Sequence, residues 1–237
     1  MKKLATALLL TLAASTTQAK TFWSDFSVTY LNGSNYEVGD SSRQVLTFEH
    51  ATGTSWGGSF LFFDRLESDN GDLETYGEWS PRIKITEFEK DSFVKSISAS
   101  GTIEMGTNFG AATFSGFGFT NYLLGIGTDL NVPGFSYFKA DVYARSNDLG
   151  DNNAQLTVVW GIPIGPLYYD GFMDYATSTD TSEASMNLTS QLKYDMASHL
   201  GLDSKLFVGI EYVLWLNKFG IDGVDENNLN LLVKYHF

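Results

Sequence analysis

Hydrophobic and polar residues alternate along most of the chain. In residues 186–196, Leu188 and Leu192 fall on one face and Gln191 and Lys193 on the other, because consecutive side chains of a β-strand point to opposite faces. This period of two recurs in segment after segment, and no helix accommodates it. The pattern therefore predicts an all-β protein.

The alternation predicts twelve strands. They lie at residues 25–32, 44–52, 56–65, 75–86, 94–106, 116–130, 135–147, 154–163, 167–178, 184–197, 204–217 and 227–237. Several odd-numbered connections are long and acidic (33–43, 66–74, 218–226), whereas several even-numbered ones are tight (53–55, 131–134, 164–166). Long loops on one rim and short turns on the other are typical of outer-membrane β-barrels, whose even strand number returns both chain ends to the periplasmic rim.

The N-terminus has the composition of a secretory signal. Lys2 and Lys3 precede an apolar run from Leu4 to Ala14, and a small-residue stretch ends at Ala19. This order of a basic start, a short apolar run and small residues predicts cleavage after residue 19. We expect a signal peptide at residues 1–19 and one barrel domain at residues 20–237, exported across the inner membrane.

Composition narrows the class of protein further. The formal net charge is −13, and loss of the two basic residues of the signal takes it to −15, which argues against a nucleic-acid partner. The chain has no cysteine and few prolines, which excludes disulfide-stapled, thiolate-zinc, collagen-like and disordered classes. Past the N-terminus no apolar run is long enough for a membrane-spanning helix.

A soluble β-sandwich would alternate as well, so we weighed it against the barrel. Many predicted strands have ten or more residues, which suits a tilted crossing of a bilayer better than a globular sheet. Aromatic residues lie on or near the ends of the apolar rows, where interfacial girdles belong; they are Phe22, Trp23, Trp79, Tyr169, Tyr175, Tyr212, Tyr235 and Phe237. The apolar rows carry almost no ionisable residue. We therefore predict a twelve-stranded antiparallel transmembrane β-barrel of the bacterial outer membrane.

The phase of the alternation also assigns side chains to the interior. Charged residues of both signs point inward, and a barrel of twelve strands is wide enough for a narrow hydrated channel. In the third strand Phe60 and Phe62 share the inward face with Asp64, and Phe172 lies in a similar row. An aromatic ring in such a wall either packs against a neighbour or meets a flat solute. Phe60 and Phe62 are therefore candidate binding residues for an aromatic solute.

The ordered set of motifs resembles the Tsx-like nucleoside-specific channels of the outer membrane, including their OmpK-type members. The stretch 45–49, followed by Trp56 and an aromatic run to Asp64, is similar to the family's second and third strands. Pro81-Arg82 is similar to its fourth strand, and residues 125–130 with 140–144 resemble a family signature. Gly171-Phe172 recurs in the ninth strand. The likeness spans most of the mature chain. The first strand departs from the family in having a single Phe22-Trp23 pair, and Gly57-Gly58 stand where bulkier side chains are expected.

The resemblance implies a monomeric barrel that lets nucleosides and deoxynucleosides diffuse passively across the outer membrane. It also implies that Glu49, Asp64, Arg82, Asp129 and Phe172 line the pathway. With such a channel we expect no catalytic residue, no metal ion and no cofactor; its partners are the permeating nucleosides and the surrounding lipid and lipopolysaccharide.

Three alternatives stay open at this point. The first is a general narrow porin without nucleoside selectivity. The second is a surface receptor, for which the resemblance implies bacteriophage attachment; its acidic loop residues, which could also bind divalent cations that bridge lipopolysaccharide, are Glu67, Asp69, Asp72, Glu74, Asp222, Asp225 and Glu226. The third is a hydrolase, which the histidines disfavour because His50, His199 and His236 have no evident serine and carboxylate partners at the extracellular end.

Overall fold

The computed structural model describes residues 20–109 and 116–237. The predicted signal peptide, residues 1–19, lies outside the described residues and stays a prediction. No helix in the described part of the chain is long and apolar enough to cross a membrane.

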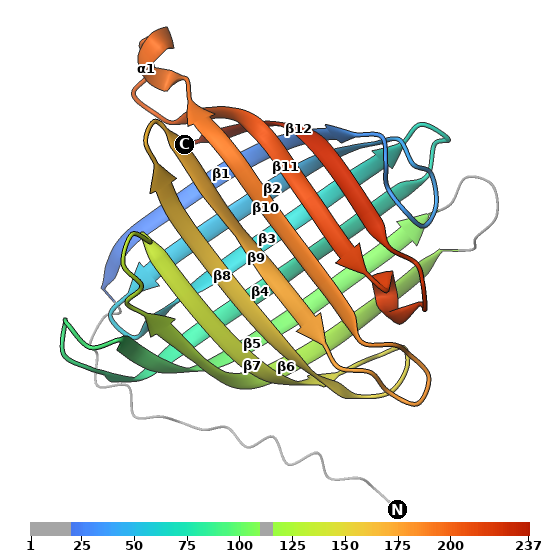
Figure 1. Ribbon diagram of the computed structural model, residues 1–237, viewed down its shortest axis with the longest axis horizontal. Helices are drawn as coiled ribbons and strands as arrows, with labels where there is room; N and C mark the ends of the chain where they lie inside the picture. The colour runs from blue at the N-terminus through green and yellow to red at the C-terminus, as the bar shows by residue number, and fades with distance from the viewer. Residues whose placement is uncertain (1–19, 110–115) are drawn as a thin grey trace, which may run out of the picture.

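Twelve antiparallel strands form one closed barrel, in which each strand pairs with its neighbours in sequence and β1 pairs with β12 (Figure 1). The strands are β1 (Thr21–Gly33), β2 (Arg43–Thr54), β3 (Gly57–Ser68), β4 (Leu73–Glu87), β5 (Val94–Phe109), β6 (Phe117–Leu130), β7 (Tyr137–Ser146), β8 (Asn153–Ile164), β9 (Leu167–Ala176), β10 (Ser185–Asp195), β11 (Leu206–Leu216) and β12 (Glu226–His236). Closure pairs every strand on both edges, so no edge is left to aggregate. The predicted fold class and all twelve strands are confirmed.

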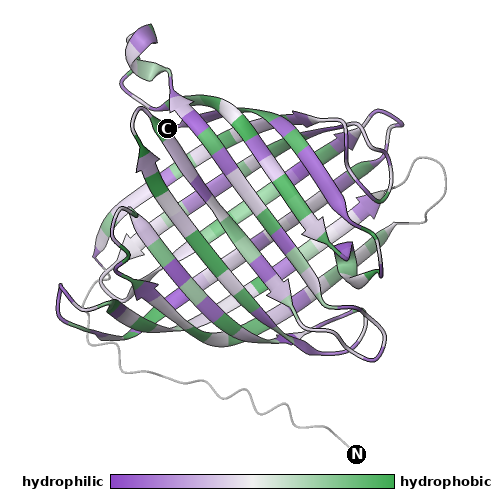
Figure 2. Cartoon of the chain, in the orientation of Figure 1, coloured by the Kyte–Doolittle hydropathy of each residue, from purple (hydrophilic) through white to green (hydrophobic). Residues whose placement is uncertain are grey.

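The two faces of the barrel differ in polarity as the alternation predicted. Along β12, Leu231 is 67% exposed on the outer surface, whereas the adjacent Asn230 is 1% exposed inside. Figure 2 shows the resulting bands of hydrophobic and hydrophilic residues along each strand. An outer surface of this kind is stable in hydrocarbon, because the backbone groups are satisfied within the sheet and the polar side chains point inward.

The described loops follow the predicted asymmetry only in part. We call the rim that carries Lys20 and Phe237 the periplasmic rim, following the topology of outer-membrane barrels. The predicted loop 66–74 narrows to 69–72, because β3 and β4 extend past its ends. On the periplasmic rim, residues 196–205 form a longer connection that contains the short helix α1 (Ala197–Leu200).

Candidate functional site

A row of aromatic side chains crosses the inner wall from β3 to β6. The ring centroids of Phe60 and Phe62 lie 6.0 Å apart, and that of Tyr76 is 5.7 Å from Phe62. Phe119 follows at 6.4 Å from Tyr76, and Phe117 at 6.1 Å from Phe119. All five residues are inward by register, since Phe60 and Phe62 share a face with the buried polar rows of the neighbouring strands. We call these five side chains the aromatic path.

Small residues of the inner wall give the rings room. A Cβ added to Gly106 would lie 2.4 Å from the Phe119 ring, so this ring rests directly on the backbone of β5. In the same way, a Cβ on Gly53 would lie 2.3 Å from Nε1 of Trp23. Because Gly53 faces inward in β2, Trp23 lies on the inner face at the periplasmic end of the barrel. The interfacial girdle predicted for Trp23 is therefore wrong for this residue.

Phe172 lies on the wall opposite the aromatic path. It is inward on β9, where it pairs with Val159 and Thr189, and β9 is six strands from β3 in the closed ring. Phe60 is 40% exposed, so solvent reaches the inner wall beside it. The structure thus places Phe60, Phe62 and Phe172 inside as predicted, on two facing walls.

A layer of charged side chains lies below the aromatic path, toward the periplasmic rim. Nη1 of Arg82 is 3.1 Å from Oδ1 of Asp129, and its Nε is 3.2 Å from Oδ1 of Asp141. Nζ of Lys139 is 4.0 Å from Asp129. Arg82 on β4 therefore joins β6 and β7 across the intervening strand, and its pairing with Asp129 brings together two of the predicted residues.

The hydrogen bonds and close contacts around Asp129 and Asp141 explain a glycine of the sequence motif. Ser96 and Ser100 on β5 donate hydrogen bonds to Asp129 and Asp141, at 2.6 and 2.5 Å. A Cβ on Gly127 would lie 1.8 Å from Oδ1 of Asp141. A side chain at this position would displace the Asp141 carboxylate from the space that it occupies between the strands.

The remaining predicted carboxylates lie in other groups. Glu49 forms an ion pair with Lys234 of β12 and accepts a hydrogen bond from Ser27 at 3.1 Å. Asp64 pairs by register with Thr47 and Tyr76, and its Oδ1 is buried without a hydrogen-bond partner. The structure therefore puts both on the inner wall as predicted but does not bring them to Arg82.

Further ion pairs complete the interior. Arg145 lies 2.7 Å from Glu104, and Lys193 lies 2.7 Å from Asp170. Inward carboxyl groups without a salt bridge in the described part of the chain are Asp64, Glu78, Asp174, Asp195 and Glu211. The interior thus offers more carboxyl groups than cations, together with many hydroxyl and amide groups.

Three members of the aromatic path were missed by the sequence reasoning. Tyr76 shares its phase with Arg82, and Phe117 and Phe119 share theirs with Asp129, so the alternation itself carried the signal. What the alternation could not give is that rings on three different strands contact one another.

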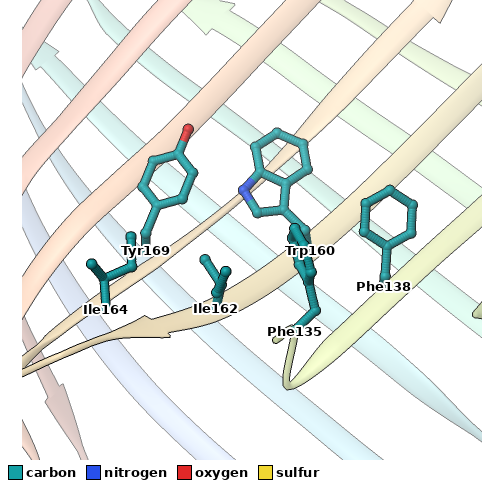
Figure 3. Close-up of a pocket in the computed structure, with 6 residues that line it drawn as sticks. All are labelled: Phe135, Phe138, Trp160, Ile162, Ile164 and Tyr169. Atoms are coloured by element: carbon teal, nitrogen blue, oxygen red, sulfur yellow. The ribbon is translucent and has the colours of Figure 1, made fainter. Parts of the chain in front are cut away.

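The outer wall has an apolar depression of about 370 Å³ on β7, β8 and β9 (Figure 3). Its lining is Phe135, Phe138, Trp160, Ile162, Ile164 and Tyr169. These strand residues have the outward phase, so the depression faces lipid and is no part of the solute pathway. Trp160 and Tyr169, whose ring centroids are 6.3 Å apart, belong to the interfacial aromatics expected there.

Two acidic residues assigned to the outer loops are instead internal. Glu74 pairs with Arg43 at 2.9 Å, and Glu226 is 2% exposed and pairs with Lys218. The prediction that they belong to an exposed acidic surface is wrong, because both lie at inward positions of strand ends. Among the described residues no group of three or more acidic or histidine side chains is placed to hold a metal ion.

Comparison with known proteins supports the fold. No protein-family model matches the chain, and no curated protein sequence matches it at a significant level. Among solved structures, the KdgM porin is 14% identical over 89% of this chain and 99% of its own, with a TM-score of 0.53. The outer membrane phospholipase A from Escherichia coli is 9% identical over 92% of this chain and 98% of its own, also with a TM-score of 0.53.

The fold and the polarity of its two faces define a twelve-stranded β-barrel of the bacterial outer membrane. At these identities the likeness concerns the fold alone. One of the matching structures is described as a KdgM porin in complex with disordered oligogalacturonate, with the same TM-score.

One serine–histidine contact bears on the hydrolase alternative. Oγ of Ser24 is 2.9 Å from Nε2 of His50, on the outer face near the periplasmic rim. The sequence analysis had found no histidine with evident serine and carboxylate partners at the extracellular end, and this contact is at the other end of the barrel. In the described part of the chain the other ring nitrogen of His50 has no hydrogen bond, whereas a nucleophilic serine needs a histidine that a third group orients. The absence of enzymatic activity stays a prediction.

Proposed function

We propose that the barrel is a passive outer-membrane channel selective for nucleosides and deoxynucleosides. The observation that carries the proposal is the aromatic path. Its five rings follow one another at 5.7 to 6.4 Å, from Phe60 to Phe117. A base can stack on such rings with a free energy of about 1 to 3 kcal/mol each, and it moves from ring to ring without losing all contact.

The polar part of the interior suits the sugar of a nucleoside. Carboxyl groups accept hydrogen bonds from hydroxyls, and Arg82 and Lys139 donate to them. Both lie beside Asp129 in the charged layer below the path. Weak contacts repeated along a wall let a solute enter without trapping it.

The charge of the interior disfavours a polyanionic solute. The KdgM porin has been solved with oligogalacturonate, but here several inward carboxyl groups have no cationic partner, among them Glu78, Asp174 and Glu211. An interior in which carboxyl groups outnumber cations disfavours the entry of a polyanion. A neutral aromatic solute meets no such barrier.

The test is uptake into liposomes that contain the purified protein. We expect adenosine and thymidine to enter faster than a neutral sugar of similar size, and trigalacturonate to enter most slowly. Equal uptake rates for the nucleosides and the sugar would contradict nucleoside selectivity and indicate a general narrow porin. Protein-free liposomes give the background rate for each solute.

The resemblance to the Tsx-like channels supports the same proposal, and its bacteriophage receptor role is kept as the second candidate. Deletions in loops 69–72 and 177–184 that abolish phage adsorption but spare nucleoside uptake would separate the two roles.

A further inference from the structure

The loop between β1 and β2, residues 34–42, turns into the barrel. Tyr36 packs against the inward side chains of Leu31, Val45 and Leu232, which form a buried apolar cluster inside the lumen. Its hydroxyl donates a hydrogen bond of 2.8 Å to Oδ1 of Asn230. Asn230 is the third inward residue of β12, so the Tyr36 hydroxyl lies below the extracellular end of that strand. We call residues 34–42 the plug loop.

Arg43, the first residue of β2, holds the plug loop at the extracellular end of the wall. Its guanidinium lies 5.3 Å from the centre of the Tyr36 ring, and its Nε donates to the Asp40 carbonyl at 2.8 Å. It also donates to the carbonyl of Val38, and Nη1 reaches Glu74 of β4 at 2.9 Å. Arg43 is 4% exposed. One buried cation therefore joins the plug loop to β4.

Glu226 holds the other end of the plug loop. Its Oε2 accepts the backbone N–H of Glu37 at 2.8 Å and the ammonium of Lys218. The side chain of Asn228 accepts the N–H of Asn35 at 3.1 Å. Lys218 belongs to the loop 217–225, so Glu226 ties two extracellular loops to the same inner wall.

The backbone of the plug loop agrees with a conformation imposed by these contacts. Val38 has a φ of 67°, a value that β-branched residues rarely adopt without tertiary support. A Cβ on Gly33, at the start of the loop, would lie 2.0 Å from Oδ1 of Asn230. Burial raises the pKa of Tyr36, so its hydroxyl stays protonated and able to donate.

The position of the plug loop decides which wall a solute can follow. Tyr36 fills the lumen beside β1, β2 and β12, and β6 is six strands from β12 in the closed ring. Phe117 and Phe119 of β6 form the upper end of the aromatic path, and Phe117 is 48% exposed. The plug thus lies opposite the upper end of the aromatic path, whereas Phe60 and Phe62 at the lower end are on β3, next to β2.

We infer that Tyr36, held by Arg43 and Glu226, is a fixed plug that sets the size limit of the pathway and directs solutes entering from the extracellular side toward Phe117 and Phe119 of the aromatic path. This inference rests on the proposed channel function. It assigns the size limit to a loop residue that is not a member of the aromatic path.

The test compares Tyr36→Ala with Tyr30→Ala in planar bilayers and in liposome swelling. Tyr30 is the matched control. It is a tyrosine of β1, close to the start of the plug loop, but it lies on the outer face and is 42% exposed. We expect Tyr36→Ala to raise single-channel conductance by about twofold or more and to admit a trisaccharide that the unaltered protein excludes. Tyr30→Ala should change neither.

Two further variants keep the inference testable. Tyr36→Phe retains the ring and loses the bond to Asn230, so we expect its size limit to match that of the unaltered protein. Folding of Tyr36→Ala is judged by the mobility of unheated protein on gels. If this variant fails to fold, Glu226→Gln takes its place, and we expect it to give an intermediate, fluctuating conductance.

Failure of this inference can be told from failure of the proposed function. Folded Tyr36→Ala with unchanged conductance and size limit would overturn the plug, even if nucleosides still pass selectively. A larger size limit in Tyr36→Ala supports the plug, even if nucleosides pass no faster than sugars.

Discussion

Substitution of Phe62 by alanine removes the ring in the middle of the aromatic path. Phe62 is the link between Phe60, 6.0 Å away, and Tyr76, 5.7 Å away. Its loss interrupts the path at one step and leaves the barrel register unchanged. If a base stacks on this ring as it does in single-strand binding proteins, the lost free energy is about 1 to 3 kcal/mol.

The expected effect on nucleoside binding follows from this energy. Since 1.4 kcal/mol corresponds to a factor of ten, binding should weaken by about 5- to 150-fold. The assay is the block of ion current by thymidine across a planar bilayer, in which the half-blocking concentration reports affinity. Phe63→Ala is the matched control, because Phe63 is the adjacent phenylalanine of β3 but lies on the outer face, 44% exposed.

The outcome separates the aromatic path from a general effect on the barrel. We expect the half-blocking concentration of thymidine to rise in Phe62→Ala and to stay unchanged in Phe63→Ala. An unchanged concentration in folded Phe62→Ala would refute the assignment of stacking to this ring. Equal shifts in both variants would attribute the effect to stability.

Three further predictions concern stability and the loops. Gly127→Ala should destabilise the barrel by about 3 kcal/mol in urea unfolding. The new Cβ would lie 1.8 Å from Oδ1 of Asp141 and would break the ion pair of Asp141 with Arg82. An unchanged unfolding midpoint would contradict this and show that the strands adjust. Leu124→Arg, at the centre of β6 and 72% exposed, should cost about 2 to 4 kcal/mol in bilayers, and a neutral result would contradict a lipid-facing position. The carboxylate of Asp40 accepts backbone hydrogen bonds, including one from Asn70 at 2.8 Å, which lower its pKa below 3.8. Its contribution is present above pH 3.8 and lost as the pH falls through the lowered pKa. The protection of the Asn70 amide, measured as its exchange rate relative to the intrinsic rate at each pH, should therefore be the same at pH 5 and pH 4 and fall only below pH 3.8; equal protection at lower pH would refute this.

The alternation was sufficient to predict the number of strands and the two faces. A strand with one lipid face and one polar face needs the period of two seen in β10 and β12, where Ser190 and Leu232 are the exceptions, and a register slip would turn every side chain to the wrong face. The inward phase of Phe60, Phe62 and Arg82 follows from the same rule and is confirmed by the register.

Contacts made across the closed barrel were beyond prediction from the sequence. Glu49 meets Lys234 only because β2 and β12 lie on either side of β1. The phase gives the direction of a side chain, not its height relative to a strand distant in sequence. The aromatic path depends on heights of this kind, which is why Tyr76 and Phe119 were not recognised as its members.

The loops were the least predictable part. Without periodicity, the residues 33–43 and 218–226 were interpreted as acidic surface, and Glu226 was assigned to it. In the structure the end of each loop turns inward and buries its charges in pairs, such as Glu226 with Lys218. Such pairing depends on how the loops fold at the extracellular end of the barrel, which no local sequence pattern encodes.

Spin labels at adjacent positions of β12 test the orientation of the wall most directly. Val233 is 45% exposed on the outer face, whereas Lys234 points inward and pairs with Glu49. In reconstituted bilayers we expect a label at Val233 to collide with oxygen dissolved in the acyl chains, and a label at Lys234 to be shielded from it. Equal oxygen accessibility at both positions, or contact of the Val233 label with a water-soluble nickel complex, would contradict a barrel with an apolar exterior and a polar interior.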